Sequence, residues 1–123
     1  MLEGGIWMGK QTVIFDFDGV INSYTSGWQG ADVIPDSPVP GIKDAIIEIR
    51  KHYRVVVVSS RCYQPGGIEA ITAWLEKYTI RVDDITDEKP PAVVIIDDRA
   101  ITFDGKTEGL LEKIRKFKPW NKK

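Results

Sequence analysis

Two carboxylates stand one residue apart at the end of an apolar run in this sequence of 123 residues. Val13-Ile14-Phe15 leads into Asp16-Phe17-Asp18, and Gly19 follows directly. Acidic side chains at the end of a hydrophobic strand are costly unless a cation or a reaction uses them. Asp-x-Asp-Gly also occurs in turns and calcium-binding loops, but three later positions do not continue the ligand pattern of a calcium loop: Asn22, Tyr24 and Gly27. The spacing favours a catalytic or metal-binding role for Asp16 and Asp18.

Two other apolar runs also end in polar residues. Ser59 and Ser60 follow residues 55–58, and Asp97 and Asp98 follow residues 92–96. Such runs, apolar on both faces, are typical of buried strands in a parallel sheet. Because ligands bind at the carboxyl ends of such strands, we expect the four acids and the two hydroxyls to share one rim of the sheet.

Four carboxylates on one rim repel one another unless a cation neutralises them. Carboxylate oxygens suit a hard ion such as Mg²⁺, which keeps coordination sites for water and for substrate phosphate. Lys89, just before the last apolar run, is expected to supply positive charge to the phosphate, and Ser59 a hydrogen bond. Asp16 is then expected to attack phosphorus as a nucleophile. Asp18 is expected to protonate the leaving oxygen and afterwards to activate water.

The segments between these runs predict the rest of the fold. Apolar residues recur at helical spacing from Ile42 to Tyr53, from Ile68 to Tyr78 and from Leu110 to Phe117, where Pro119 ends the pattern. Residues 80–85 predict a short strand at or near a sheet edge. Buried strands that alternate with amphipathic helices imply right-handed crossovers. The expected fold class is α/β, with a three-layer α/β/α Rossmann-like parallel sheet.

The length predicts one domain over residues 1–123, with a lead-in over 1–10 and a tail over 119–123. Residues 20–40 show no helical or strand period, and an irregular loop of this length is usually functional. Trp28 within it is expected either to contact a substrate or partner subunit, or to pack the loop down. Trp74 and Trp120 are expected to be packing residues.

The order of these segments resembles the haloacid dehalogenase (HAD) superfamily. The resemblance rests on residues 15–20, 57–61, 89–90 and 95–98, within a span of 12–105. It implies a HAD-like domain with Asp16 as nucleophile, Asp18 as general acid and base, Ser59 on the phosphate, Lys89 as its countercharge, and Asp97 and Asp98 on the metal. Of this last pair, Asp98 is the expected direct ligand and Asp97 a supporting or alternate one. An aspartate at position 18 resembles the phosphatase branch of the superfamily.

Ser59-Ser60-Arg61 stands where the family more often has Thr-Gly-Arg, so Ser59 and Ser60 are both candidates for the phosphate contact. Arg61 is expected to bind either the substrate phosphate or an acid of the site. The resemblance also places a flap in residues 20–40 and leaves no room for a cap domain there or in 61–89. It therefore implies a capless member with an open site, which suits a large substrate or a homo-oligomer that covers the site.

Composition restricts the partners. The formal net charge of -1 provides no strong field for polyanions. A basic cluster near the C-terminus is expected to be a solvated helix face and tail: Lys113, Arg115, Lys116, Lys118, Lys122 and Lys123. The single cysteine, Cys62, fits a reducing cytoplasm. No run approaches the roughly 18 apolar residues of a membrane span, and residues 1–10 do not resemble a secretion signal. We expect a cytoplasmic protein without a membrane partner.

The sequence therefore predicts a Mg²⁺-dependent phosphohydrolase that acts on a phosphomonoester of unknown size through an aspartyl-phosphate on Asp16. Three alternatives stay open. A nucleic-acid end-processing phosphatase would use the basic C-terminal segment, although the weak net charge does not favour it. A phospho-receiver or binding module shares the acid pair, hydroxyl and lysine, but receivers place Lys-Pro after the final strand, whereas Lys89-Pro90 precedes it here. The third is a non-catalytic HAD-like protein.

Overall fold

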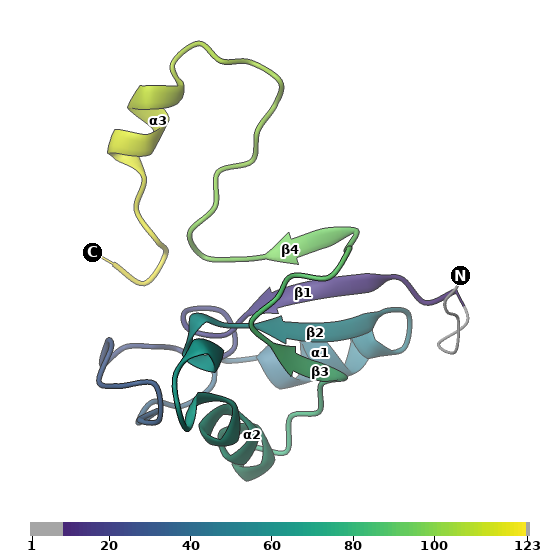
Figure 1. Ribbon diagram of the computed structural model, residues 1–123. Helices are drawn as coiled ribbons and strands as arrows, with labels where there is room; N and C mark the ends of the chain where they lie inside the picture. Colours follow the sequence, from purple (N-terminus) through teal and green to yellow (C-terminus); the bar gives the residue numbers. More distant parts are fainter. Residues whose placement is uncertain (1–8, 123) are drawn as a thin grey trace.

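A four-stranded parallel sheet carries the fold in the computed structural model, which describes residues 9–122 (Figure 1). The strands are β1 (Thr12–Asp16), β2 (Arg54–Val58), β3 (Asp84–Thr86) and β4 (Val94–Ile96), in the order β3-β2-β1-β4. The helices are α1 (Ile42–Arg50), the 3₁₀ helix η1 (Ser60–Tyr63), α2 (Gly67–Lys77) and α3 (Leu110–Lys116). The predicted α/β class with a parallel sheet is confirmed, as is the edge position of the short β3.

The two central strands are the most deeply buried. β1 and β2 pair in register from Thr12 with Arg54 to Asp16 with Val58. Their inner residues are apolar on both faces, so both faces lose contact with water, as expected for parallel strands. This pairing sets Asp16 and the residues after Val58 side by side at one rim.

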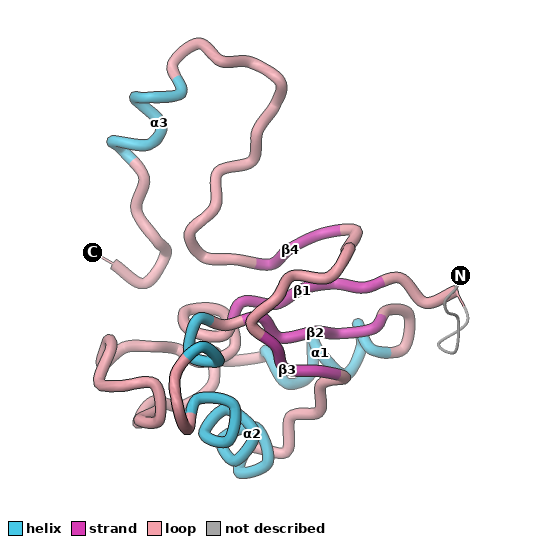
Figure 2. The backbone as a smooth tube through the Cα atoms, viewed as in Figure 1, coloured by secondary structure: helices cyan, strands magenta, loops and turns pink. Residues whose placement is uncertain are grey.

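α1 and α2 cover the same face of the sheet. Val13 and Phe15 alternate to that face of β1, and they belong to one core cluster with Ile46 of α1 and with Ile71 and Trp74 of α2. Trp74 meets Phe17 edge to face at 5.1 Å between ring centroids, so its predicted packing role is confirmed. A third layer on the opposite face is not formed by α3, which stands away from the sheet (Figures 1 and 2).

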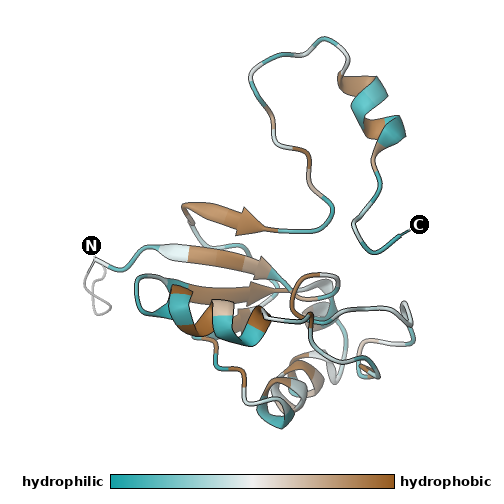
Figure 3. Cartoon of the chain, turned by 180° about the vertical axis from the view of Figure 1, so that it is seen from behind, coloured by the Kyte–Doolittle hydropathy of each residue, from teal (hydrophilic) through white to brown (hydrophobic). Residues whose placement is uncertain are grey.

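The prediction of a buried last strand over 92–96 is wrong. β4 covers only Val94–Ile96, and its residues are 38–49% exposed. Along β4 the sheet is paired on one side only, with β1, and α1 lies over the other strands (Figure 3). Apolar composition predicts the strand correctly, but burial depends on a covering element that the fold does not place there.

Residues 97–122, here called the arm, leave the end of β4 and return to the same rim (Figure 1). α3 within the arm buries none of its residues, and Leu111 and Ile114 are each 59% exposed. Trp120 is 60% exposed, so its predicted packing role is wrong. Its indole Nε1–H instead donates to the Gly19 carbonyl at 2.7 Å. The arm therefore continues from β4 at one end and is hydrogen-bonded at the other end to the loop after β1.

No helix in the described part of the chain has the length and apolar character needed to span a bilayer.

Candidate active site at the carboxyl end of the sheet

Three aspartates meet at the rim. Asp16 is the last residue of β1, and Asp97 and Asp98 directly follow β4, its neighbour in the sheet. One carboxylate oxygen from each lies within 4.8 Å of the other two. Parallel strands deliver their carboxyl ends to the same edge, which is why three acids from distant parts of the chain converge. Their oxygens form a donor set that suits a hard divalent cation.

Asp16 is the acid most affected by this crowding. Burial raises its pKa most, and a hydrogen bond with Asp98 and the charges of Asp97 and Asp98 add to the effect, so the pKa reaches about 8. The cluster by itself therefore retains a proton at neutral pH. A divalent cation would remove the repulsion that keeps that proton in place.

Asp18 does not join this cluster. Its carboxylate accepts hydrogen bonds from Arg61, at 2.9 Å from Nε to Oδ2 and 3.0 Å from Nη2 to Oδ1. The buried Asn22 donates from Nδ2 to the same carboxylate at 2.9 Å. The structure thus brings together three of the four acids predicted as metal ligands, Asp16, Asp97 and Asp98. The fourth, Asp18, lies outside this cluster because Arg61 and Asn22 bind its carboxylate.

Arg61 is completely buried and bonds an acid of the site, the second of its two predicted roles. Besides Asp18, its Nη1 donates to the carbonyls of Gly30, Ala31 and Val33 at 2.8–3.2 Å. Its guanidinium carbon lies 4.8 Å from the centroid of the Trp28 ring. These contacts lie inside the protein and connect Asp18, in the loop after β1, to residues 30–33 of the flap. The geometry therefore gives no support to a phosphate contact by Arg61.

The two serines differ in exposure. Ser59 is 4% exposed, and its Oγ accepts a hydrogen bond from the Arg61 backbone N–H at 3.2 Å, which caps η1. Ser60 is exposed at the start of η1. Both line the same cavity as Asp16, so both remain candidates for a phosphate contact.

Two cavities open at Asp16, and both are lined by Asp16, Ser59, Ser60 and Asp97. The larger, of about 650 Å³, also contains Lys89. The smaller, of about 320 Å³, is also lined by Asp18 and Asp98, by Trp28, and by two residues that the sequence does not single out as site residues, Tyr24 and Arg99. The sequence predicts that Trp28 either contacts a substrate or partner subunit or packs the loop down, and its place in the cavity lining is compatible with the first role. The position of Arg99, directly after the acid pair, is a signal that could find it, but nothing local marks Tyr24.

Gly19 lets the loop after β1 lie close to Asp98 of the three-aspartate cluster. It adopts a left-handed backbone conformation with φ 84°, which glycine tolerates best. A Cβ at this position would collide with the Asp98 carboxylate. The glycine of Asp-x-Asp-Gly therefore serves both the turn and the approach of Asp98 to the β1 loop.

Comparisons of the chain with models of known protein families, with curated proteins and with solved structures find no match. The function is therefore argued from the geometry of the rim.

Proposed function

We propose that the protein is a Mg²⁺-dependent phosphohydrolase of the HAD type, which cleaves a phosphomonoester through an aspartyl-phosphate on Asp16. The observation that carries this proposal is the position of Asp16. It belongs to a three-carboxylate cluster suited to a divalent cation and lines both the cavity with Lys89 and the cavity with Asp18.

The charges around the two cavities suggest how the substrate lies. Lys89 lines only the larger cavity, whose lining also includes the hydroxyls of Ser59 and Ser60 and the acids Asp87 and Glu88. The phosphoryl group is best placed at Lys89 and the two hydroxyls, which can donate to it. Mg²⁺ held by Asp16, Asp97 and Asp98 would offset the negative charge of that group. Asp18 lines only the smaller cavity, where a proton donor would meet the leaving oxygen.

Two steps complete the reaction. An Asp16 carboxylate oxygen forms a bond to phosphorus while the ester bond breaks, and the leaving oxygen takes a proton from Asp18. A water oxygen then bonds to phosphorus, the aspartyl-phosphate bond breaks, and Asp18 receives the water proton. Inorganic phosphate leaves, Asp16 is again an ionised carboxylate, and Asp18 again carries the proton with which it began the first step.

Replacement of the nucleophile tests the proposal. Purified protein with Mg²⁺ should hydrolyse p-nitrophenyl phosphate, and chelation of the metal should abolish turnover. Asp16→Asn should lower kcat by at least about a thousandfold, because an amide cannot form the acyl-phosphate. The matched control is Asp44→Asn, an exposed acid of α1 outside both cavities. Turnover by Asp16→Asn at the wild-type rate would refute the mechanism.

A further inference from the structure

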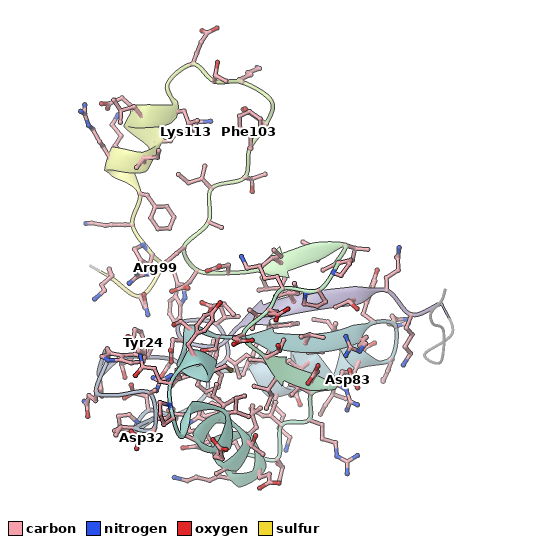
Figure 4. The ribbon with its side chains drawn as sticks, viewed as in Figure 1. Tyr24, Asp32, Asp83, Arg99, Phe103 and Lys113 are labelled. Atoms are coloured by element: carbon pink, nitrogen blue, oxygen red, sulfur yellow. The ribbon has the colours of Figure 1, made fainter. Side chains whose placement is uncertain are left out.

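The smaller cavity has an aromatic lining that the proposed reaction does not use. Tyr24 and Trp28, both on the flap, line it together with Asp18 and Arg99. Figure 4 shows Tyr24 and Arg99 on the same side of the molecule, near the base of the arm. Aromatic side chains that line a cavity beside reactive groups are usual in sites for small molecules.

Trp28 is oriented by a buried arginine and remains partly exposed to solvent. Arg61, whose side chain is wholly buried, lies against one face of the indole, with 4.8 Å between the guanidinium carbon and the ring centroid. Arg61 is in turn bonded to Asp18 and to three flap carbonyls. Trp28 nevertheless remains 48% exposed. A large ring is thus oriented in advance, which reduces the entropy that a stacked ligand would lose.

Tyr24 is placed by a backbone conformation that is uncommon for its residue type. Its φ is 60°, in the left-handed region. Its N–H donates to the Asn22 Oδ1 at 3.3 Å, and the same Asn22 side chain bonds Asp18. Such conformations persist where the surrounding structure holds them, and they concentrate at functional sites. Asp18 and the two aromatic residues are therefore positioned by one connected set of contacts.

We infer that the smaller cavity receives a planar ring in the leaving group of the phosphomonoester, stacked on Trp28 beside Tyr24. The inference rests on the proposed function, because Asp18 marks this cavity as the leaving-group side. About 320 Å³ is near the lower limit of small-molecule sites, which suits one ring system attached directly or through a sugar. An aryl-bearing ester and a nucleoside monophosphate share this chemistry.

Two pairs of phosphate esters test whether the cavity prefers a planar ring. Within each pair the phosphate is attached to the same kind of carbon. Benzyl phosphate and cyclohexylmethyl phosphate differ in the planarity of the ring. Adenosine 5′-monophosphate and ribose 5-phosphate differ in the presence of the base. With Mg²⁺, we expect kcat/KM to be about tenfold higher for the planar member of at least one pair, the size of one stacking contact. The first pair identifies a directly attached ring, and the second a nucleotide.

Variants at position 28 assign the preference to Trp28. Trp28→Leu should bring the ratio of kcat/KM within the discriminating pair close to one, mainly through KM, and Trp28→Phe should retain most of it. Phe103→Leu is the matched control, because Phe103 is an exposed aromatic residue of the arm outside both cavities. Circular dichroism checks that each variant is folded. If Trp28→Leu does not fold, the comparison of Trp28→Phe with the wild type still tests the inference.

The outcomes separate this inference from the proposed function. Equal turnover of all four esters would overturn the planar ring and leave the phosphohydrolase intact, as would an unchanged ratio in Trp28→Leu. Failure to hydrolyse any of the four would count against the phosphohydrolase. In that case, calorimetry with Mg²⁺ would compare the affinities for adenosine 5′-monophosphate and ribose 5-phosphate. About tenfold tighter binding of the nucleotide would support the stacking site, and equal affinities would overturn it.

Discussion

Asp16 lies where an ionised carboxylate is disfavoured. Burial and the two neighbouring acids raise its pKa from 3.8 to about 8. A raised folded-state pKa means that the proton stabilises the folded protein, and that this stability is lost as pH rises from about 4 to about 8. Cation binding works in the opposite direction, because the ligand must be deprotonated.

The affinity of the metal-free protein for Mg²⁺ should therefore depend on pH. Between pH 6 and pH 8 the association constant should rise by up to about tenfold per pH unit, and it should level off above pH 8. Calorimetry in two buffers of different ionisation enthalpy would also count the released proton. Asp44→Asn should follow the same curve as the wild type. A Mg²⁺ affinity that is constant from pH 6 to pH 8 would contradict the conclusion that Asp16 is protonated in the metal-free protein.

At the scale of the elements, Asp83 joins three segments at the end of the sheet away from Tyr24 (Figure 4). Its Oδ2 accepts from the backbone N–H of Val55, the second residue of β2, at 2.8 Å. Its Oδ1 accepts from Arg50 Nη2, at the end of α1, at 2.8 Å. Burial alone would raise the pKa of Asp83, but the hydrogen bonds from Arg50 and Val55 and the nearby positive charges outweigh burial and lower it.

Asp83→Asn should reduce the free energy of unfolding by about 1–2 kcal/mol at pH 7, because the charged partner of Arg50 is lost. A lowered folded-state pKa contributes stability above the unfolded value, and this contribution is lost as pH falls below about 4. Urea denaturation should be measured at pH 7 and at pH 3. The difference in free energy of unfolding between Asp83→Asn and the wild type should be smaller at pH 3.

The neighbouring Asp84→Asn is the control for this comparison. Asp84 pairs with Arg54 at 3.5 Å, and its side chain is 51% exposed. An exposed pair of this kind contributes little, so its loss should cost well under about 1 kcal/mol. If both variants lose the same free energy of unfolding at pH 7, the contacts of Asp83 do not stabilise the fold more than the exposed pair does.

At the scale of the whole molecule, the position of the arm depends on contacts at its C-terminal end. Trp120 bonds the Gly19 carbonyl at 2.7 Å, and Asn121 Nδ2 bonds the Ser23 carbonyl at 3.4 Å. α3 buries no residue, so packing against the rest of the protein contributes little to its position. The arm should therefore open locally at low cost.

Trp120→Phe should release the arm, because phenylalanine cannot donate the hydrogen bond. Limited digestion with trypsin should cleave the variant after the basic residues of α3 faster than it cleaves the wild type. Mass spectrometry of the fragments identifies the cleavage sites. The urea midpoint should change little, because the core cluster contains no arm residue. Tyr53→Phe, outside the arm, should digest like the wild type. Unchanged cleavage in Trp120→Phe would mean that this bond does not hold the arm.

The residues that form the rim can be predicted because their signals are local. Apolar runs predict β1, β2 and the position of β4, and parallel strands carry their ends to one edge. Strand polarity is therefore enough to predict that Asp16, Asp97 and Asp98 lie together. It cannot separate Asp18 from them, because that depends on Arg61, which lies 43 positions away along the chain.

The sequence by itself determined the α/β class, the strands and helices, and the acids that converge at the rim, since periodicity and strand polarity act over short distances. Only the tertiary structure decided that Arg61 turns Asp18 away from the cluster and supports Trp28, that Gly19 must lack a Cβ beside Asp98, and that β4 and α3 remain exposed. Each of these depends on contacts between distant parts of the chain, where buried charge and close packing select one arrangement among many that the local pattern allows.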